Sequence, residues 1–337
     1  MRCLRGRLSH GSHLTRGIKN MKKIFLGAFT ALFSFLGAYA YDLPKPDLTL
    51  KLYPEGQGVD KGIVENGKAI TLGPLESNGL TGDNVVNPNS GNIANIGDGA
   101  FMDIYLPKNC NGQMIVVCPG GGYSNVSAAN EGSRVADWCL KRDIAVCVVL
   151  YRMPNHHNKV PLTDVQNAFR YCRAHAAEWG VNKIGVMGFS AGGHLAASAS
   201  TLFTDEITRP DFSILVYPVI TLEEFVTHAG TRFYLLPERA GKREVDYYSL
   251  ENQVTEKTPE TIILLCADDF AVAPENSIRY YRAMQAHHVK GELHIFTRGG
   301  HGWGFTTNEN AGRDGLGDAQ RADFFNILDR WLKQINR

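Results

Sequence analysis

The chain has 337 residues, of which 44 % are hydrophobic, an ordinary share for a globular protein with a sizeable core. Its formal net charge of +1 is unevenly distributed, because the first 40 residues hold seven Lys and Arg and no acidic residue. The remaining residues carry 28 basic and 34 acidic side chains, a net charge of −6, which argues against nucleic acid as a partner.

Residues 1–40 have the features of a targeting segment. Met21-Lys22-Lys23 is a short positive region, and the apolar stretch from Ile24 to Gly37 is too short to span a bilayer comfortably. The small residues of Ala38-Tyr39-Ala40 form a cleavage site. We predict that translation starts at Met21 and that a secretory signal peptide is cleaved after Ala40. The mature protein is then secreted or periplasmic, without stable membrane insertion.

Residues 41–99 are rich in Gly, Pro and Asn and predict an irregular N-terminal arm, in which 48–52 alternates like an edge strand. Apolar strands and amphipathic helices then alternate over 100–337. Such alternation predicts one α/β domain over 100–337, with a mostly parallel central sheet and helices on both faces. Residues 221–257 interrupt this rhythm with charged and aromatic residues, and we expect them to form a short insertion over the active site. The predicted strands are 101–106, 114–118, 144–150, 183–187, 214–217, 261–266 and 292–296, and the predicted helices include 131–141, 162–179, 275–288 and 319–334.

Seven cysteines are present, and their spacing suggests no zinc site. Most of them fall in predicted strands or helices, as buried small hydrophobic residues do. We therefore expect no metal site. A disulfide would be compatible with export, but the sequence does not indicate a pair.

The segment Gly188–Gly192 has the pattern G-x-S-x-G. It lies between the apolar run 183–187 and a run of helix-forming residues that starts at His194. A serine on a sharp strand-to-helix turn is the context in which this pattern indicates a nucleophile, whereas the pentapeptide alone could be a plain turn. Ser190 is therefore the candidate nucleophile.

A serine hydroxyl needs a base, and in α/β-hydrolases the partners follow in the order Ser, acid, His. His301 lies on a Gly-rich loop after the last predicted strand and is the candidate general base. Two neighbouring acids, Asp268 and Asp269, follow strand 261–266. We favour Asp268 as the partner of His301 because it is closer to the strand, and Asp269 remains the alternative.

The Gly-rich run Pro119–Tyr123 follows the buried strand 114–118. Its backbone can present N–H groups to an oxyanion, and we expect the amides of Gly121, Gly122 and Ala191 to form the oxyanion hole. A dinucleotide or phosphate loop is disfavoured, because the G-x-G-x-x-G spacing and a Walker-type lysine are missing. Tyr123 and Trp303, which neighbour these groups in sequence, are candidate substrate contacts.

Several segments together carry a family resemblance: Pro119–Tyr123, Tyr151-Arg152, 162–179, Gly188–Ala196, Ser249–Thr255, Ala267–Asp269 with Pro274–Ser277, and Gly299–Gly302. They resemble the α/β-hydrolase esterase/lipase family, near the hormone-sensitive-lipase-like enzymes and the acetylxylan-esterase branch. The resemblance spans roughly residues 100–335 and implies a serine esterase without a cofactor. In similar enzymes the acid is often the first Asp of a D-x-x-V pattern, which we place at Asp268. The sequence departs from the family at Pro119, where many relatives have His, and at Phe270–Ala273.

The resemblance and the predicted export together predict an exported serine ester hydrolase. Its substrate would be a small ester or an acetylated polysaccharide or oligosaccharide, with acetyl groups on xylan as the leading case. A serine exopeptidase on the same fold and a non-catalytic glycan-binding protein are the alternatives.

Overall fold

The computed structural model describes residues 43–53, 64–65, 68–69, 85–86, 91–94, 96, 100–306 and 315–337. The chain divides into the units Met1–Leu43 and Pro44–Arg337, and all described helices and strands belong to the second. The predicted signal peptide, with its start at Met21 and its cleavage site at Ala40, lies outside the described residues. Among the helices of the described ranges, none is both long and apolar enough to cross a bilayer.

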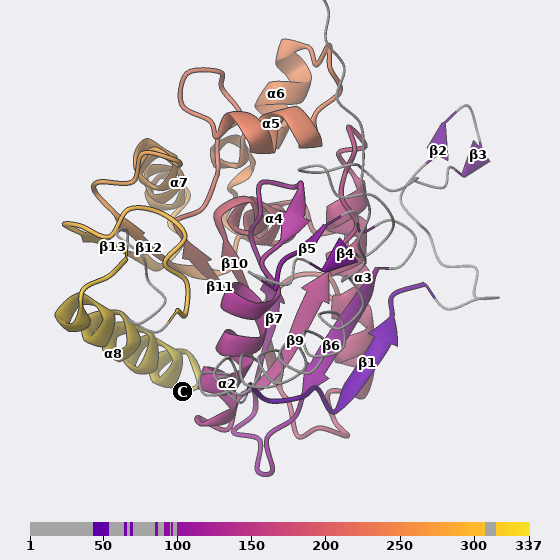
Figure 1. Ribbon diagram of the computed structural model, residues 1–337, viewed down its shortest axis with the longest axis vertical. Helices are drawn as coiled ribbons and strands as arrows, with labels where there is room; N and C mark the ends of the chain where they lie inside the picture. The colour runs from indigo at the N-terminus through magenta and orange to yellow at the C-terminus, as the bar shows by residue number, and fades with distance from the viewer. Residues whose placement is uncertain are drawn as a thin grey trace, which may run out of the picture. The chain divides into compact units, whose positions relative to one another are not determined.

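An eight-stranded sheet organises the second unit, with the strand order β1-β6-β9-β7-β10-β11-β12-β13 (Figure 1). The six strands from β9 to β13 in this order run parallel, while β6 pairs antiparallel with β9 and β1 antiparallel with β6. This sheet confirms the predicted α/β class. The strands are β1 (Leu48–Lys51), β6 (Phe101–Tyr105), β7 (Gln113–Cys118), β9 (Ala145–Leu150), β10 (Lys183–Phe189), β11 (Phe212–Val216), β12 (Glu260–Cys266) and β13 (Gly291–Phe296).

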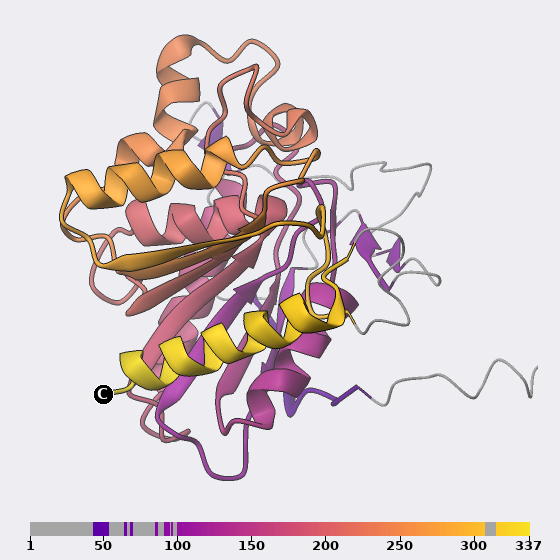
Figure 2. The ribbon, with the colours of Figure 1, turned by 90° about the vertical axis from the view of Figure 1, so that its left-hand side faces the viewer.

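The central strands are continuous apolar runs because helices cover both faces of the sheet. Every residue of β7, β9 and β11 is buried, whereas the edge strands β1 and β13 are partly exposed. Trp138 of α2 (Arg134–Leu140) stacks on Phe325 of α8 (Asp318–Ile335), so these helices share one face. The other face carries α3 (Val160–His175), α4 (Ser190–Thr201) and α7 (Glu275–Ala286) (Figure 2).

Residues 221–257 form the predicted insertion, which contains α5 (Ala229–Leu235), α6 (Lys242–Tyr248) and the single turn Leu250–Gln253. Figure 2 shows α5 and α6 together at one end of the sheet. The carboxyl ends of parallel strands meet at one edge of a sheet, which is where α/β folds place their ligands.

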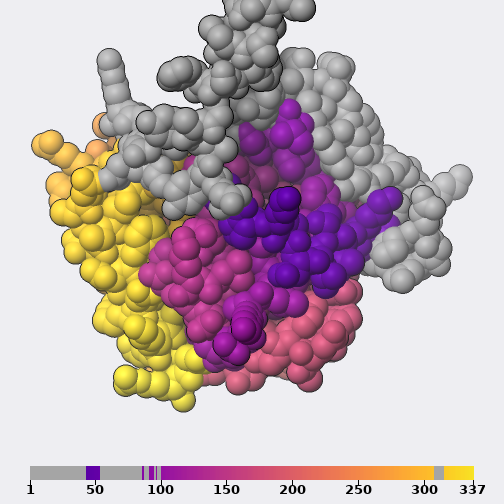
Figure 3. All heavy atoms as spheres, turned by 60° about the horizontal axis from the view of Figure 1, so that its bottom comes forward, coloured from indigo at the N-terminus to yellow at the C-terminus, as the bar shows by residue number. Residues whose placement is uncertain are grey.

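Part of the predicted irregular arm is built into the domain. The expected edge strand is confirmed as β1, and in Figure 3 the indigo residues 44–53 lie against the purple surface of the strands that follow. Tyr53 at the end of this segment is buried and hydrogen-bonds to the buried ion pair of Arg152 and Asp164. Further short strands are β2 (Val64–Glu65) with β3 (Lys68–Ala69), and β4 (Val85–Val86) with β5 (Ile93–Ala94) and β8 (Asn125–Val126).

Candidate active site

Ser190 stands on the sharp turn between β10 and α4, as the G-x-S-x-G pattern predicts. Its backbone is in the left-handed region, with φ of 54°, a strained conformation for a residue with a side chain. The turn needs glycine on both sides, since a Cβ on Gly188 would lie 2.1 Å from the Gly192 oxygen and a Cβ on Gly192 2.1 Å from the Cys118 oxygen. The hydroxyl is thereby held at the N-terminus of α4, where the helix dipole favours negative charge.

Three side chains, from the loops that follow β10, β12 and β13, are linked by hydrogen bonds at this turn. His301 Nε2 lies 2.8 Å from Ser190 Oγ, and His301 Nδ1 lies 2.7 Å from Asp269 Oδ2. Ser190 follows β10, Asp269 follows β12 and His301 follows β13. The arrangement gives the serine a base within proton-transfer distance and gives the base a carboxylate that fixes its tautomer.

The expectation that Asp268 is the partner of His301 is wrong. The Asp269 carboxylate is buried, with 1 % of its side chain exposed, and its Oδ1 accepts the N–H groups of Ala271 and Val272 at 3.0 and 2.9 Å. These bonds leave Oδ2 for the imidazole. The signal was present in the sequence, because a D-x-x-V pattern counted from Asp269 ends at Val272.

Asp268 instead holds the backbone of the loop that carries His301. Its carboxylate accepts the N–H groups of Gly300 at 2.9 Å and Gly299 at 3.3 Å. These bonds, with that of Gly300 the largest cause, lower the pKa of the Asp268 carboxyl below its usual range. The two acids lie on the turn that follows β12, where their side chains point in different directions and reach different groups.

The Gly-rich loop after β7 turns toward Ser190. Gly121 and Gly122 adopt positive φ angles of 134° and 65°, and both line the same cavity as Ser190. Among the described residues, no backbone acceptor takes the N–H groups of Gly121 and Gly122. Two unused donors beside the serine are what an oxyanion hole requires.

Two residues that the sequence analysis missed connect this loop to the His301 loop. The buried Glu131 accepts the Gly120 N–H at 2.6 Å and the Tyr217 hydroxyl at 2.7 Å, and Gly304 N–H donates to the same hydroxyl at 2.8 Å. The Tyr217 and His301 ring centroids are 4.7 Å apart. Burial raises the pKa of Glu131 above its usual range. In the sequence Glu131 only begins an amphipathic segment, so no signal marks it.

A cavity of about 380 Å³ lies in front of Ser190 and His301. The insertion contributes His228, Gly230 and Tyr234 to its lining, which confirms that 221–257 borders the site. Polar residues outside the insertion also line it, namely Asn92, Ser124, Ser127 and Asn130.

Tyr123 and Trp303 are not substrate contacts in this structure, because both are about 99 % buried and neither lines the cavity. The Tyr123 hydroxyl lies 3.1 Å from Nδ1 of the buried His194. The Trp303 ring packs edge-on against the rings of Tyr217 and Phe324. Both side chains therefore pack against buried residues around the site and do not line its cavity.

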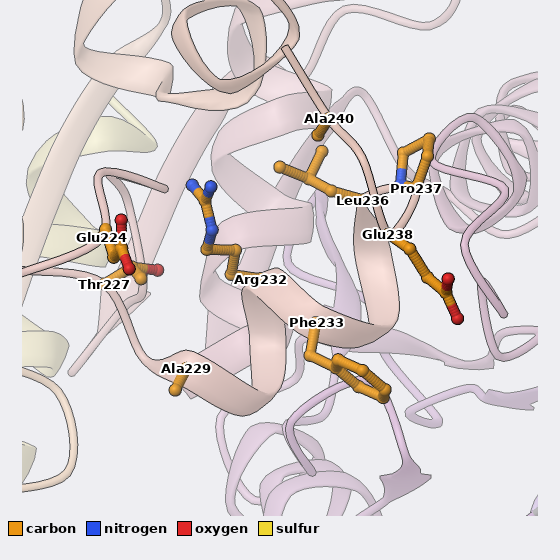
Figure 4. Close-up of a pocket in the computed structure, with 9 residues that line it drawn as sticks. All are labelled: Glu224, Thr227, Ala229, Arg232, Phe233, Leu236, Pro237, Glu238 and Ala240. Carbon is orange, nitrogen blue, oxygen red and sulfur yellow. The ribbon is translucent and has the colours of Figure 1, made fainter. Parts of the chain in front are cut away.

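Helix α5 borders both the active-site cavity and a second hollow of about 360 Å³, whose lining residues are drawn in Figure 4. Gly230 and Tyr234 face the first, whereas Ala229, Arg232 and Phe233 line the second. In Figure 4 the side chains of Arg232 and Phe233 leave the helix in different directions. The Arg232 guanidinium donates to the Leu222 carbonyl, which ties α5 to the start of the insertion.

No group of three or more His, Cys, Asp or Glu within the described ranges could hold a metal ion. The six described cysteines are free thiols; five are buried within strands or helices and Cys110 is half-buried in a loop. Burial raises the pKa of Cys118 and Cys139 well above the usual range, so these thiols remain protonated.

Comparison with known proteins agrees with this fold. The sequence model of the BD-FAE family matches residues 102–214. An acetylxylan esterase of Xylanibacter ruminicola is 40 % identical over 214 residues, which are 62 % of this chain and 44 % of that protein. The endo-1,4-beta-xylanase B of Butyrivibrio fibrisolvens is 34 % identical over 206 residues, 56 % of this chain and 32 % of that protein. The chain thus spans less than half the length of both relatives.

Among solved structures, an acetyl ester-xyloside bifunctional hydrolase from Caldicellulosiruptor lactoaceticus is similar to this chain with a TM-score of 0.68 and 27 % sequence identity. The match covers 88 % of this chain and 98 % of that one. The sheet order, the serine turn and these similarities agree with one another. The chain has the fold of the α/β-hydrolases and is similar in sequence and structure to esterases.

Proposed function

We propose that the protein is an exported serine carboxylic ester hydrolase that removes acetyl groups from xylan or its oligosaccharides. The observation that carries the proposal is the series Ser190–His301–Asp269, with distances of 2.8 and 2.7 Å, beside the unused N–H groups of Gly121 and Gly122. A nucleophile, a base, an oriented acid and oxyanion donors are the four parts of acyl transfer.

In the first half of the reaction His301 Nε2 takes the Ser190 proton while Oγ attacks the ester carbonyl carbon. The N–H groups of Gly121, Gly122 and Ala191 stabilise the oxyanion, and Asp269 stabilises the imidazolium. The C–O bond to the alcohol then breaks, His301 protonates the leaving oxygen, and the acyl group remains on Ser190.

In the second half a water molecule gives its proton to His301 and attacks the acyl carbon. The new tetrahedral intermediate uses the same donors. When it collapses, the bond to Ser190 Oγ breaks, the serine regains its proton from His301, and the carboxylic acid leaves.

Two observations support an acetylated sugar as substrate. The cavity of about 380 Å³ is lined by several Asn and Ser side chains, which suits a substrate with hydroxyl groups. An acetylxylan esterase and an acetyl ester-xyloside hydrolase are among the similar proteins. Export rests on the signal peptide predicted for residues 21–40.

Acetate release from acetylated xylan, with the wild type beside Ser190→Ala, tests the proposal. We expect release by the wild type and a loss of about 10⁴-fold or more in the variant, because no other group replaces the nucleophile. Turnover of p-nitrophenyl acetate alone would make the substrate class wrong while leaving the mechanism in place. Folded protein that cleaves neither ester would favour the glycan-binding alternative, and cleavage of a peptide substrate would favour the exopeptidase.

A further inference from the structure

His228 is a second histidine in the active-site cavity, and its ring has one nitrogen already in use. It precedes α5, and its Nδ1 accepts the N–H of Thr231 at 3.1 Å, which caps the first turn of that helix. A nitrogen that accepts a hydrogen bond carries a lone pair. In the neutral ring the proton therefore resides on Nε2, which makes this atom a donor.

The environment keeps this ring neutral. Burial, and then the positive charge that His301 can carry, lower the pKa of His228 below its usual range, and the negative charge of Asp269 offsets only part of this. At neutral pH, His228 thus offers one N–H and no free acceptor. It can act as a hydrogen-bond donor but not as a second general base.

The ring lies beside the Gly-rich loop Pro119–Tyr123, here called the oxyanion loop, which carries Gly121 and Gly122. Its Cε1, the atom next to Nε2, is 3.5 Å from the position that a Cβ on Gly122 would occupy, and the residue lines the same cavity as Ser190 and His301. Within the described part of the chain, Nε2 has no hydrogen-bond partner, and it is not among the polar atoms sealed from solvent. The donor is therefore available to a molecule in the cavity.

An ester presents three branches to this site. Backbone N–H groups meet the carbonyl oxygen, and an acetyl methyl group accepts no hydrogen bond. Only the alcohol branch of a sugar ester brings further acceptors, its hydroxyl and ring oxygens. We propose that His228 Nε2–H donates a hydrogen bond to such an oxygen and thereby selects sugar esters over esters of plain alcohols. This inference rests on the proposed function.

The test compares two acetate esters of secondary ring alcohols, a mono-O-acetylated methyl xylopyranoside and cyclohexyl acetate, which lacks hydroxyl and ring oxygens. Two variants of the full protein separate the two ring nitrogens. In His228→Asn the amide oxygen can still cap Thr231, but nothing replaces Nε2–H. In His228→Gln the amide reaches the Nε2 position and can donate there. The measured quantity is the ratio of kcat/KM for the sugar ester to kcat/KM for cyclohexyl acetate.

We expect His228→Asn to lower this ratio by about three- to tenfold, the size of one neutral hydrogen bond, and His228→Gln to restore most of it. The thermal midpoint of His228→Asn should stay near that of the wild type. An unchanged ratio overturns the inference while wild-type acetate release upholds the proposed function. An equal fall in kcat/KM for both esters also overturns the inference, because Nε2–H would then donate to the oxyanion, which both esters share. A wild type that does not cleave the sugar ester overturns both.

Discussion

Asp268 and Asp269 are adjacent in the chain, yet they hold different parts of the active site. The first accepts backbone N–H groups from the loop of His301, and the second accepts from the imidazole itself. A carboxylate on the ring fixes its tautomer and stabilises the imidazolium, whereas a carboxylate on the loop only places it. Substitution of either acid should therefore lower the activity, but by different amounts and for different physical reasons.

Asp269→Asn should lower kcat by roughly 10³- to 10⁴-fold, because the amide can favour the wrong tautomer of His301. Asp268→Asn is the matched control, and we expect a loss of about tenfold or less, since the loop keeps its other contacts. Steady-state hydrolysis of p-nitrophenyl acetate measures both. A larger loss for Asp268→Asn than for Asp269→Asn would show that the hydrogen bond to His301 is not the one that matters.

At the scale of elements, the turn between β10 and α4 is fixed by the close approach of β7. The Gly192 Cα faces the carbonyl oxygens of Cys118 and Pro119, with no room for a side chain. The same contact joins the nucleophile turn to the loop with the oxyanion donors. A shift of either element therefore separates Ser190 from Gly121 and Gly122.

Gly192→Ala should abolish detectable esterase activity or prevent folding, because its Cβ would overlap backbone that cannot move aside alone. Gly241→Ala serves as the control, since nothing lies within 4 Å of its added Cβ. We expect it to cost about 1 kcal/mol or less of unfolding free energy, as for a poor helix cap, with full activity. Circular dichroism measures the folding and stability of both variants, and ester hydrolysis measures their activity. An active Gly192→Ala protein would contradict the close contact.

At the scale of the whole molecule, buried polar groups tie distant segments together. His194 of α4 lies between the Tyr123 hydroxyl of the oxyanion loop, at 3.1 Å, and the Tyr248 carbonyl at the end of α6, at 2.9 Å. The ring is fully buried, and burial lowers the pKa of His194 to about 4. The neutral ring donates from Nε2 to the carbonyl and accepts the tyrosine proton at Nδ1.

This burial predicts a loss of stability in acid. Above pH 6.5 the ring is neutral in both states, but below it the unfolded chain takes up a proton that the folded protein does not. The unfolding free energy should fall by about 3 kcal/mol between pH 6.5 and pH 4 from this residue. Urea unfolding at several pH values, for the wild type and His194→Gln, measures the difference. Equal slopes for the two proteins would contradict the assignment.

The fold class, the serine turn and the base could be predicted from the sequence. Short continuous apolar runs bounded by Gly and Pro favour strands covered on both faces, and the glycines around Ser190 mark a sharp turn. The Gly-rich loop with His301 follows the last strand of the sheet. Because the carboxyl ends of parallel strands meet at one edge, this position predicts that His301 lies near Ser190. These features depend on local composition and chain order, which the sequence records directly.

Three features could not be predicted: which acid meets His301, that Tyr123 and Trp303 are buried, and that Glu131, Tyr217 and His228 belong to the site. Each of these depends on the direction of a side chain relative to a segment far away in the chain, such as Glu131 against Tyr217. Neighbouring residues of like chemistry, such as Asp268 and Asp269, are equivalent until a turn aims one of them at a partner. Side-chain direction is set by packing between segments, and packing is a property of the folded chain alone.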